Sequence, residues 1–187
     1  VTTFLALSNT RMPVIPINPD APPEVLLPWI KQSKATHLAV TSDLAANART
    51  LLQSVHLHLP IIEIEKKHGG EYDTSYTPAP DNKPLETDPV LFMRSQGTAA
   101  SAQLPFFTHK QLQYGATPLR GAYKLSSVDR VHTSMSWSNP FSFSHGLLLP
   151  LLTGATCVID HGMEATEFVD FLSKARVTRT VGTPADA

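Results

Sequence analysis

The sequence predicts an α/β fold in which two lobes of mostly parallel β-sheet are flanked by helices. Short runs of β-branched and other apolar residues alternate with amphipathic helical segments, which is the pattern of strand–helix–strand units. A polar stretch at 66–87, which has no hydrophobic period, separates two such series. The chain of 187 residues is 42% hydrophobic, so it can bury a sizeable core.

The first lobe is expected at 1–65, and its elements follow from local signals. The run PVIPIN at 13–18 predicts a strand at a sheet edge or a strand end, because its prolines have no N–H to donate. Pro22 and Pro23 predict the start of a helix, since proline fits the first helical turn. The other expected elements are a strand at 37–41, a helix at 44–55 capped by Ser42 or Asp43, and a strand at 60–64.

The second lobe is expected at 88–187, after a linker at 66–87. Its first strand, at 89–94, is a continuous apolar run of the kind found in buried sheets. Thr108 predicts the N-terminal cap of a helix that reaches Tyr123. The remaining expected elements are a strand at 129–137, a helix at 141–152 that ends near Gly154, a strand at 155–159, a helix at 164–175 and a strand at 177–181.

Charge and composition exclude several classes of function. The formal net charge is −1 and the basic residues are scattered, which argues against a nucleic-acid partner. Cys157 is the only cysteine, so an internal disulfide is excluded. His56 and His58 lack a third ligand at suitable spacing, so they do not predict a zinc site, and the sequence gives no residues that we assign as metal ligands.

Targeting signals are also missing from the sequence. No apolar stretch approaches the length of a transmembrane segment, and the start VTTFLAL lacks the basic residues and cleavage site of a signal peptide. We therefore expect a cytoplasmic protein. Both ends of the sequence cut into predicted elements, which indicates a piece of a longer protein.

The segment at 88–109, DPVLFMRSQGTAASAQLPFFTH, is the most informative stretch of the chain. An apolar strand ends in a loop of small and hydroxylated residues, and a second apolar run then leads into a helix. Such a loop lets the backbone approach phosphate closely. An unliganded connection between two strands is the alternative interpretation, because the loop lacks the lysine that phosphate-binding loops normally carry.

Four segments carry a family resemblance, and they occur in the family's order. The chain resembles the large N-terminal domain of the adenylate-forming enzymes, which include acyl-CoA synthetases, acyl-carrier-protein synthetases, peptide-synthetase adenylation domains and luciferases. The matching segments begin MPVIPINP at 12–42, DPVLFMRSQGT at 88–112, DRVHTSMSWSNP at 129–159 and VTRTVGTP at 177–187.

The resemblance implies a phosphate loop with contacts from Ser95, Gln96, Gly97, Thr98 and Gln103. Gly97 and Thr98 stand where the family has its first Gly-Thr. Gln103 stands at the position of the family's lysine, and it can donate a hydrogen bond but adds no charge. The loss of one charge-assisted contact costs roughly 1.5–3 kcal/mol, which weakens nucleotide binding without excluding it.

The resemblance also implies a substrate pocket lined by Trp137, Asn139 and Phe141. The family usually has a histidine near its acyl pocket, and two ways of aligning this segment place either Asn139 or Phe143 at that position. Asn139 can also be a helix cap that precedes a proline, and at least two of the aromatic residues are expected in the core.

The function implied by the resemblance is that of an ATP- and Mg²⁺-dependent ligase. Such an enzyme converts a carboxylic acid into an acyl-adenylate and passes the acyl group to coenzyme A or to the pantetheine of a carrier protein. The family's later segments are absent from these residues, so we expect a fragment that is inactive alone. The alternative is a non-catalytic, adenylation-like binding module with a degenerate phosphate loop.

Overall fold

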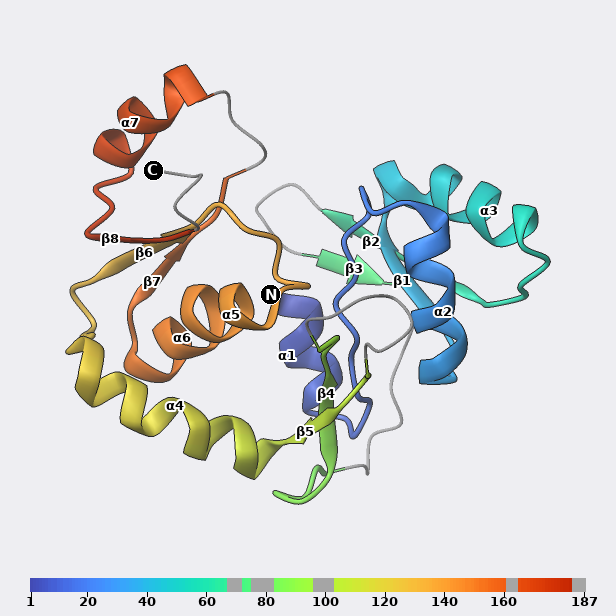
Figure 1. Cartoon of the computed structure of the whole chain (residues 1–187), viewed down its shortest axis with the longest axis horizontal. Helices are drawn as coiled ribbons and strands as arrows, with labels where there is room; N and C mark the ends of the chain where they lie inside the picture. The colour runs from blue at the N-terminus through green and yellow to red at the C-terminus, as the bar shows by residue number, and fades with distance from the viewer. Residues whose placement is uncertain (67–71, 75–82, 96–102, 161–164, 183–187) are drawn as a thin grey trace. The chain divides into compact units, whose positions relative to one another are not determined.

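The computed structural model of the protein describes residues 1–66, 72–74, 83–95, 103–160 and 165–182 (Figure 1). These residues form a larger unit, which combines residues 1–20 with 83–187, and a smaller unit of residues 21–82. The elements are α-helices and β-strands in mostly parallel sheets, which confirms the predicted α/β fold class. None of the helices in these residues has both the length and the apolar character needed to cross a bilayer.

The N-terminal segment groups with the later part of the chain, whereas the sequence placed it in the first lobe. The Val14 N–H donates to the Val90 carbonyl at 2.9 Å, and the Phe92 N–H donates to the Val14 carbonyl at 2.9 Å. The strand predicted at 13–18 is therefore reduced to one isolated bridge between Val14 and Leu91. Prolines on both sides of this bridge lack an N–H, which prevents the ladder from extending.

The smaller unit is a three-stranded sheet with two helices. Its elements are α2 (Pro23–Ser33), β1 (Leu38–Thr41), η1 (Ser42–Leu44), α3 (Ala45–Ser54), β2 (Ile61–Lys66) and β3 (Tyr72–Thr74). β1 and β2 pair in parallel, as the strand–helix–strand pattern predicts, and β3 pairs antiparallel to β2. β3 lies within the predicted linker, so part of that segment extends the sheet.

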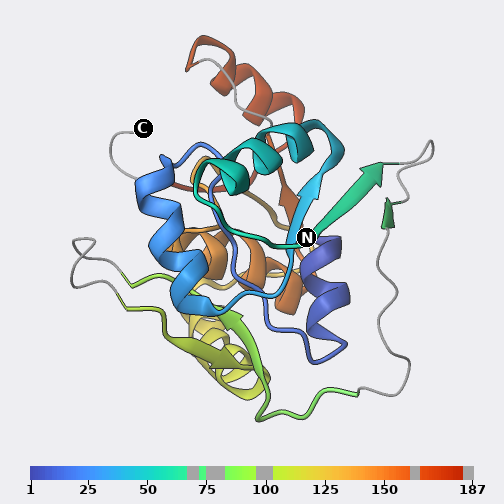
Figure 2. The ribbon, with the colours of Figure 1, turned by 90° about the vertical axis from the view of Figure 1, so that its right-hand side faces the viewer.

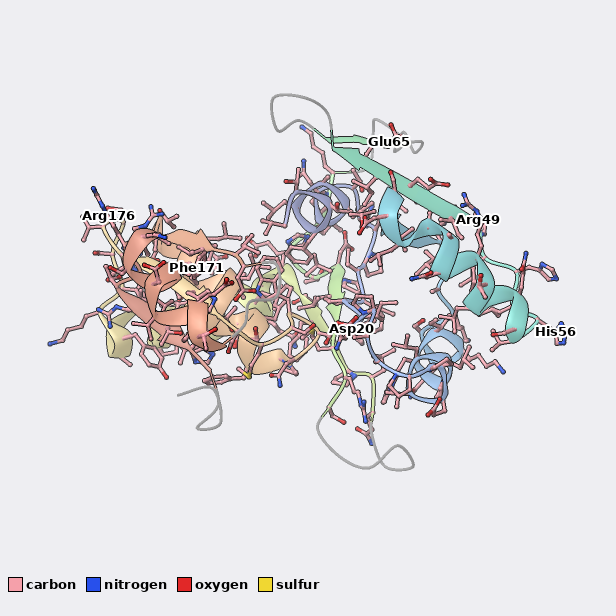
Figure 3. All side chains as sticks on the ribbon, turned by 90° about the horizontal axis from the view of Figure 1, so that it is seen from above. Asp20, Arg49, His56, Glu65, Phe171 and Arg176 are labelled. Carbon is pink, nitrogen blue, oxygen red and sulfur yellow. The ribbon has the colours of Figure 1, made fainter. Side chains whose placement is uncertain are left out.

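The helices of the smaller unit show one correct and one wrong prediction. Leu26, Trp29 and Ile30 of α2 are buried at helical spacing, as expected. The predicted capping of the next helix by Ser42 or Asp43 is wrong, because both residues lie in the η1 turn and α3 has no side-chain cap. On α3, Arg49 (Figure 3) forms an ion pair with Glu63 of β2.

The larger unit contains a hairpin and a parallel sheet. Its strands are β4 (Pro89–Phe92), β5 (Phe106–Thr108), β6 (Arg130–Thr133), β7 (Thr156–Val158) and β8 (Arg179–Val181). Its helices are α1 (Thr2–Ser8), α4 (His109–Tyr123), α5 (Pro140–Ser142), the π-helix η2 (Phe143–Leu148), α6 (Leu149–Thr153) and α7 (Ala165–Lys174). β4 and β5 pair antiparallel and lead into α4 (Figures 1 and 2). β6 pairs in parallel with β7 on one side and β8 on the other.

Helices cover both faces of this parallel sheet. Figure 1 shows α7 on one face and α5 and α6 on the other. Val131 of β6 is buried with Leu149 of α6 and Ala116 of α4. His132, the next residue, packs against Phe168 and Phe171 of α7. Successive strand residues point to opposite faces, so this one strand contributes to two different layers.

The helix predicted at 141–152 is a run of α5, η2 and α6 whose middle turn is widened into a π-helix. The run ends as predicted at Gly154, which has the left-handed φ of 74°. Gly146, inside the π-helix, lies so close to β6 that an added Cβ would be 2.5 Å from Thr133 Cγ2. The absence of a side chain at this position lets the helical run pack on the sheet.

Candidate functional site

The β4–β5 hairpin stays paired beyond its two named strands, up to the mouth of the loop at 96–102. The Met93 N–H donates to the Pro105 carbonyl at 3.1 Å, and the Ser95 N–H donates to the Gln103 carbonyl at 2.9 Å. These two backbone hydrogen bonds continue the antiparallel ladder of β4 and β5 to the base of the predicted loop. We name this described part of the candidate site, residues 93–95 and 103–105, the hairpin mouth.

Ser95 and Gln103 hold the hairpin mouth together by a side-chain contact as well. The Gln103 N–H donates to Ser95 Oγ at 2.8 Å. The oxygen of this hydroxyl accepts that bond, so its hydrogen is still available to donate to a ligand. Gln103 is exposed, and its side-chain amide adds two further donors. The other predicted loop contacts, Gln96, Gly97 and Thr98, lie outside the described residues.

One face of the hairpin forms a core with the helical run. Leu91 and Met93 are 1% and 3% exposed and pack in a cluster with Phe143 and Leu147. Trp137 is partly buried against the same cluster. Ser95 follows Leu91 and Met93 on this face by strand alternation. The structure therefore packs Trp137 against the face of the hairpin on which Ser95 also lies.

The other two residues of the predicted substrate pocket have different surroundings. Asn139 Oδ1 accepts hydrogen bonds from the backbone N–H groups of Phe141 at 2.9 Å and Ser142 at 3.5 Å, so Asn139 caps α5. Phe141 is 44% exposed, and its ring lies 4.2 Å from the ring of His145. Tyr123 contacts the same His145 ring at 5.4 Å. Phe141 thus belongs to a surface aromatic group, and Trp137 is the pocket residue that joins the core.

The ends of the hairpin far from the mouth are anchored by polar contacts. Arg11 Nε and Nη2 donate to the two carboxylate oxygens of Asp88 at 2.7 and 3.1 Å. The side-chain hydrogen bond from Arg11 lowers the pKa of Asp88, with a further contribution from the Leu85 N–H. Thr108 caps α4, as predicted, and forms a reciprocal capping box with Gln111. Both strands are thereby fixed before they reach the loop.

A buried polar chain in the parallel sheet escaped the sequence analysis. His132 is 0% exposed, its Nε2 lies 2.9 Å from Asp160 Oδ2, and its Nδ1 lies 3.3 Å from Thr180 Oγ1. An ionised carboxylate only accepts hydrogen bonds, so the contact with Asp160 assigns a proton to Nε2, and in the neutral imidazole Nδ1 then accepts from the Thr180 hydroxyl. The available signal was a histidine in the strand-like run RVHT, because a strand of a parallel sheet that is covered by helices on both faces buries the side chains of both faces.

Metal ligation finds no support in these residues. Within the ranges that the structure describes, no group of three or more His, Cys, Asp or Glu side chains could hold a metal ion. The single thiol, Cys157, is half-buried, and burial raises its pKa.

Comparison with known proteins adds a family and a set of similar folds. The family model described as "AMP-binding enzyme" matches residues 1–186. No curated protein matches the chain. The crystal structure of CmiS6 is 23% identical with a TM-score of 0.75, and the match covers 98% of this chain and 42% of that one. A long-chain-fatty-acid-CoA ligase (FadD1) from Archaeoglobus fulgidus is 23% identical with a TM-score of 0.74, covering 98% of this chain and 37% of that one.

A third similar structure is MatB from Rhodopseudomonas palustris with ATP bound. It is 12% identical with a TM-score of 0.73, and the match covers 98% of this chain and 36% of MatB. At these identities the likeness is one of fold. The chain spans less than half the length of each of these three structures.

Proposed function

The chain belongs to the AMP-binding enzyme family, and on this premise we propose that it is the nucleotide-binding part of an ATP-dependent acid–thiol ligase. In the first step a carboxylate oxygen attacks the α-phosphorus of ATP. The bond from that phosphorus to the bridging oxygen breaks, and pyrophosphate leaves with the electron pair. In the second step a thiolate attacks the acyl carbon, and AMP leaves with the electrons of the acyl–oxygen bond.

The hairpin mouth is the observation that carries this proposal. Its ladder and the bond from the Gln103 N–H to Ser95 Oγ fix the base of a small-residue loop in advance. Donors that are already positioned cost little to order when an anion binds. The Ser95 hydroxyl and the Gln103 amide are proposed to donate to phosphate oxygens, together with the loop residues Gln96, Gly97 and Thr98. The similarity in fold to MatB, which was solved with ATP, agrees with this assignment.

The acid is proposed to bind on the side of the helical run. Trp137 packs on the core behind the hairpin, and Asn139 keeps its side-chain NH₂ for a ligand while its oxygen caps α5. Phe141, which is at the surface, is proposed to line the outer side of this acid-binding site. The similarity in fold to a long-chain-fatty-acid-CoA ligase supports an acyl substrate, with coenzyme A or a carrier-protein pantetheine as the thiol.

Magnesium belongs to the chemistry implied by the family resemblance, and a magnesium ion that accompanies a nucleotide is held largely by phosphate oxygens, with only one or two carboxylates from the protein. We therefore assign Mg²⁺ no ligand and no step in this chain. The role proposed for the described residues is to bind the polyphosphate and to orient it toward the acid.

Calorimetric titration of the chain with ATP·Mg²⁺ tests the proposal. We expect measurable binding that Thr98→Ala abolishes, because that substitution removes a loop hydroxyl. Gln103→Lys should tighten binding by about tenfold, since it adds the charge that the loop lacks.

Absence of heat at millimolar ATP would contradict the proposal. Binding of an acyl compound by a chain that does not bind ATP would instead identify the alternative, a non-catalytic module. Mass spectrometry of an acid–ATP mixture checks the chemistry, and we expect no acyl-adenylate from this chain alone.

A further inference from the structure

The buried polar chain of the parallel sheet joins a carboxylate, an imidazole and a hydroxyl in that order. Asp160 Oδ2 lies 2.9 Å from His132 Nε2, and Thr180 Oγ1 lies 3.3 Å from His132 Nδ1. The contact with Asp160 places a proton on Nε2, so in the neutral ring Nδ1 faces the Thr180 hydroxyl with its lone pair. A hydroxyl, a base within reach of it and a third group that orients the base are the parts of an activated nucleophile.

Strand register brings the base and the hydroxyl together. His132 of β6 and Thr180 of β8 are partners in the parallel ladder, so their side chains lie next to each other on one face of the sheet. Asp160 comes two residues after the end of β7, which pairs with β6 on its other side. The spacing between the imidazole and the hydroxyl is therefore set by backbone pairing between two strands.

The base and the hydroxyl residue differ in their access to solvent. His132 is 0% exposed, and its ring lies 5.5 Å from the ring of Phe168 and 5.7 Å from that of Phe171, both on α7. Thr180 is exposed. A reagent at the surface therefore meets the threonine, whereas water is kept away from the imidazole behind it. Exclusion of water strengthens the electrostatic contacts between the imidazole and its partners.

We infer that Thr180 is a nucleophile toward activated acyl esters, with His132 as its general base. Thr180 Oγ1 attacks the carbonyl carbon of the ester, and its proton passes to His132 Nδ1. The bond from that carbon to the leaving oxygen breaks, and the phenolate leaves with the electron pair while the acyl group stays on Thr180. His132 then releases its proton to solvent. Water hydrolyses the threonine ester by giving a proton to His132, which returns it to the departing Thr180 oxygen. This chemistry is independent of nucleotide binding.

Reaction with p-nitrophenyl acetate tests the inference. We expect a burst of p-nitrophenolate that approaches the protein concentration and is followed by slower turnover, and tandem mass spectrometry should find the acetyl group on Thr180. Thr180→Ala should remove the burst, whereas Thr180→Ser keeps the hydroxyl and should retain it. Thr178→Ala is the matched control, because Thr178 is also exposed but its hydroxyl donates to the Asp129 carboxylate at 3.0 Å. This control should leave the burst unchanged.

His132→Gln tests the base, because a glutamine amide can still form hydrogen bonds but does not take up a proton. It should slow the burst by about a hundredfold or more. Circular dichroism checks that this buried variant is folded, and the exposed threonine variants decide the question if it is not. The inference is overturned by the absence of a burst from the unchanged chain, by a burst that survives Thr180→Ala, or by an acetyl group found on Cys157 and not on Thr180.

Discussion

On one face of β6, Val131 is 1% exposed and packs with the buried apolar residues Ala116, Leu125, Leu149 and Ala155. On the other face, His132 is 0% exposed and lies between Asp160 and Thr180, beneath two phenylalanine rings. Val131 and His132 are neighbours on one strand and are equally buried. Val131 lies among apolar side chains, whereas His132 lies between polar partners.

The difference lies in how each face responds to change. An apolar contact is lost in proportion to the area or volume removed, and neighbouring side chains can partly adapt. A buried imidazole needs a partner for each nitrogen, because an unpaired polar group keeps its full desolvation cost. The apolar face therefore depends on shape, whereas the histidine face depends on particular partners.

The largest effect is expected where the apolar side is packed most closely. Gly146→Ala would place a methyl group 2.5 Å from Thr133 Cγ2 and 2.9 Å from Thr133 Cβ. Neither the π-helix nor the strand can move easily, so we expect a loss of about 2–3 kcal/mol in the free energy of unfolding. Denaturant titration measures this loss, and addition of Thr133→Ser should recover part of it by removing Cγ2.

Gly115→Ala is the matched control, because its added Cβ meets no atom within 4 Å. It lies in the interior of α4, where alanine is favoured over glycine by roughly 0.5–1 kcal/mol. A gain in stability at Gly115 and a loss at Gly146 is the expected pair of results. Equal effects at the two sites would contradict the close packing of the π-helix on β6.

The second-largest loss of stability is expected from changes on the histidine face of β6. Asp160→Ala removes the acceptor from the buried His132 Nε2, and we expect the free energy of unfolding to fall by about 1–2 kcal/mol. Asp160→Asn keeps an acceptor oxygen, so it should lower the free energy of unfolding by less than Asp160→Ala does. His132→Leu combined with Asp160→Ala should cost less than the sum of the single changes, because neither polar partner remains. Strict additivity in this double-mutant cycle would show that the contact carries no coupling energy.

The smallest effect is expected at the start of β6, where polar groups are near solvent. The Ser126 backbone N–H and the Arg179 side chain lower the pKa of Asp129 to about 2. An unfolded aspartate has a pKa of about 3.9, so its stabilising contribution is complete above that value and disappears as the pH falls toward 2. Asp129→Asn should therefore lower the Tm at pH 7.

The difference in Tm between Asp129→Asn and the unchanged protein should shrink progressively below about pH 4 and be mostly lost near pH 2. Asp170→Asn is the control, because it breaks an exposed pair with Lys174 and should change the Tm little at any pH. A difference in Tm that is as large at pH 2 as at pH 7 would mean that the negative charge of Asp129 is not what stabilises the fold.

Much of the fold could be predicted because the decisive signals are local. Thr108 and Gln111 are three residues apart and define the start of α4 without any distant contact. Gly154 adopts the left-handed conformation that ends a helix, and the sequence indicates this directly. Local signals also explain the wrong prediction at Ser42 and Asp43. Either residue is suited to cap a helix, but in the structure both lie in the η1 turn that follows β1.

The candidate site could be predicted only in part. The position of Ser95 and Gln103 near a loop follows from the sequence, but their mutual hydrogen bond depends on the register of two strands. Trp137, Asn139 and Phe141 are neighbours in sequence and were grouped as one pocket. The structure separates them into a core residue, a helix cap and a member of a surface ring group.

The sequence by itself determined the order of most helices and strands, the small-residue segment before the second apolar run and the family to which the chain is matched. These properties follow from residues that are adjacent in the sequence, from the spacing of hydrophobic residues and from short motifs. The tertiary structure alone decided that Val14 joins Leu91, that His132 meets Asp160 and Thr180, and that the Gln103 N–H donates to Ser95 Oγ. Each of these contacts joins residues on separate segments, so it depends on strand register and chain crossing, which local sequence does not encode.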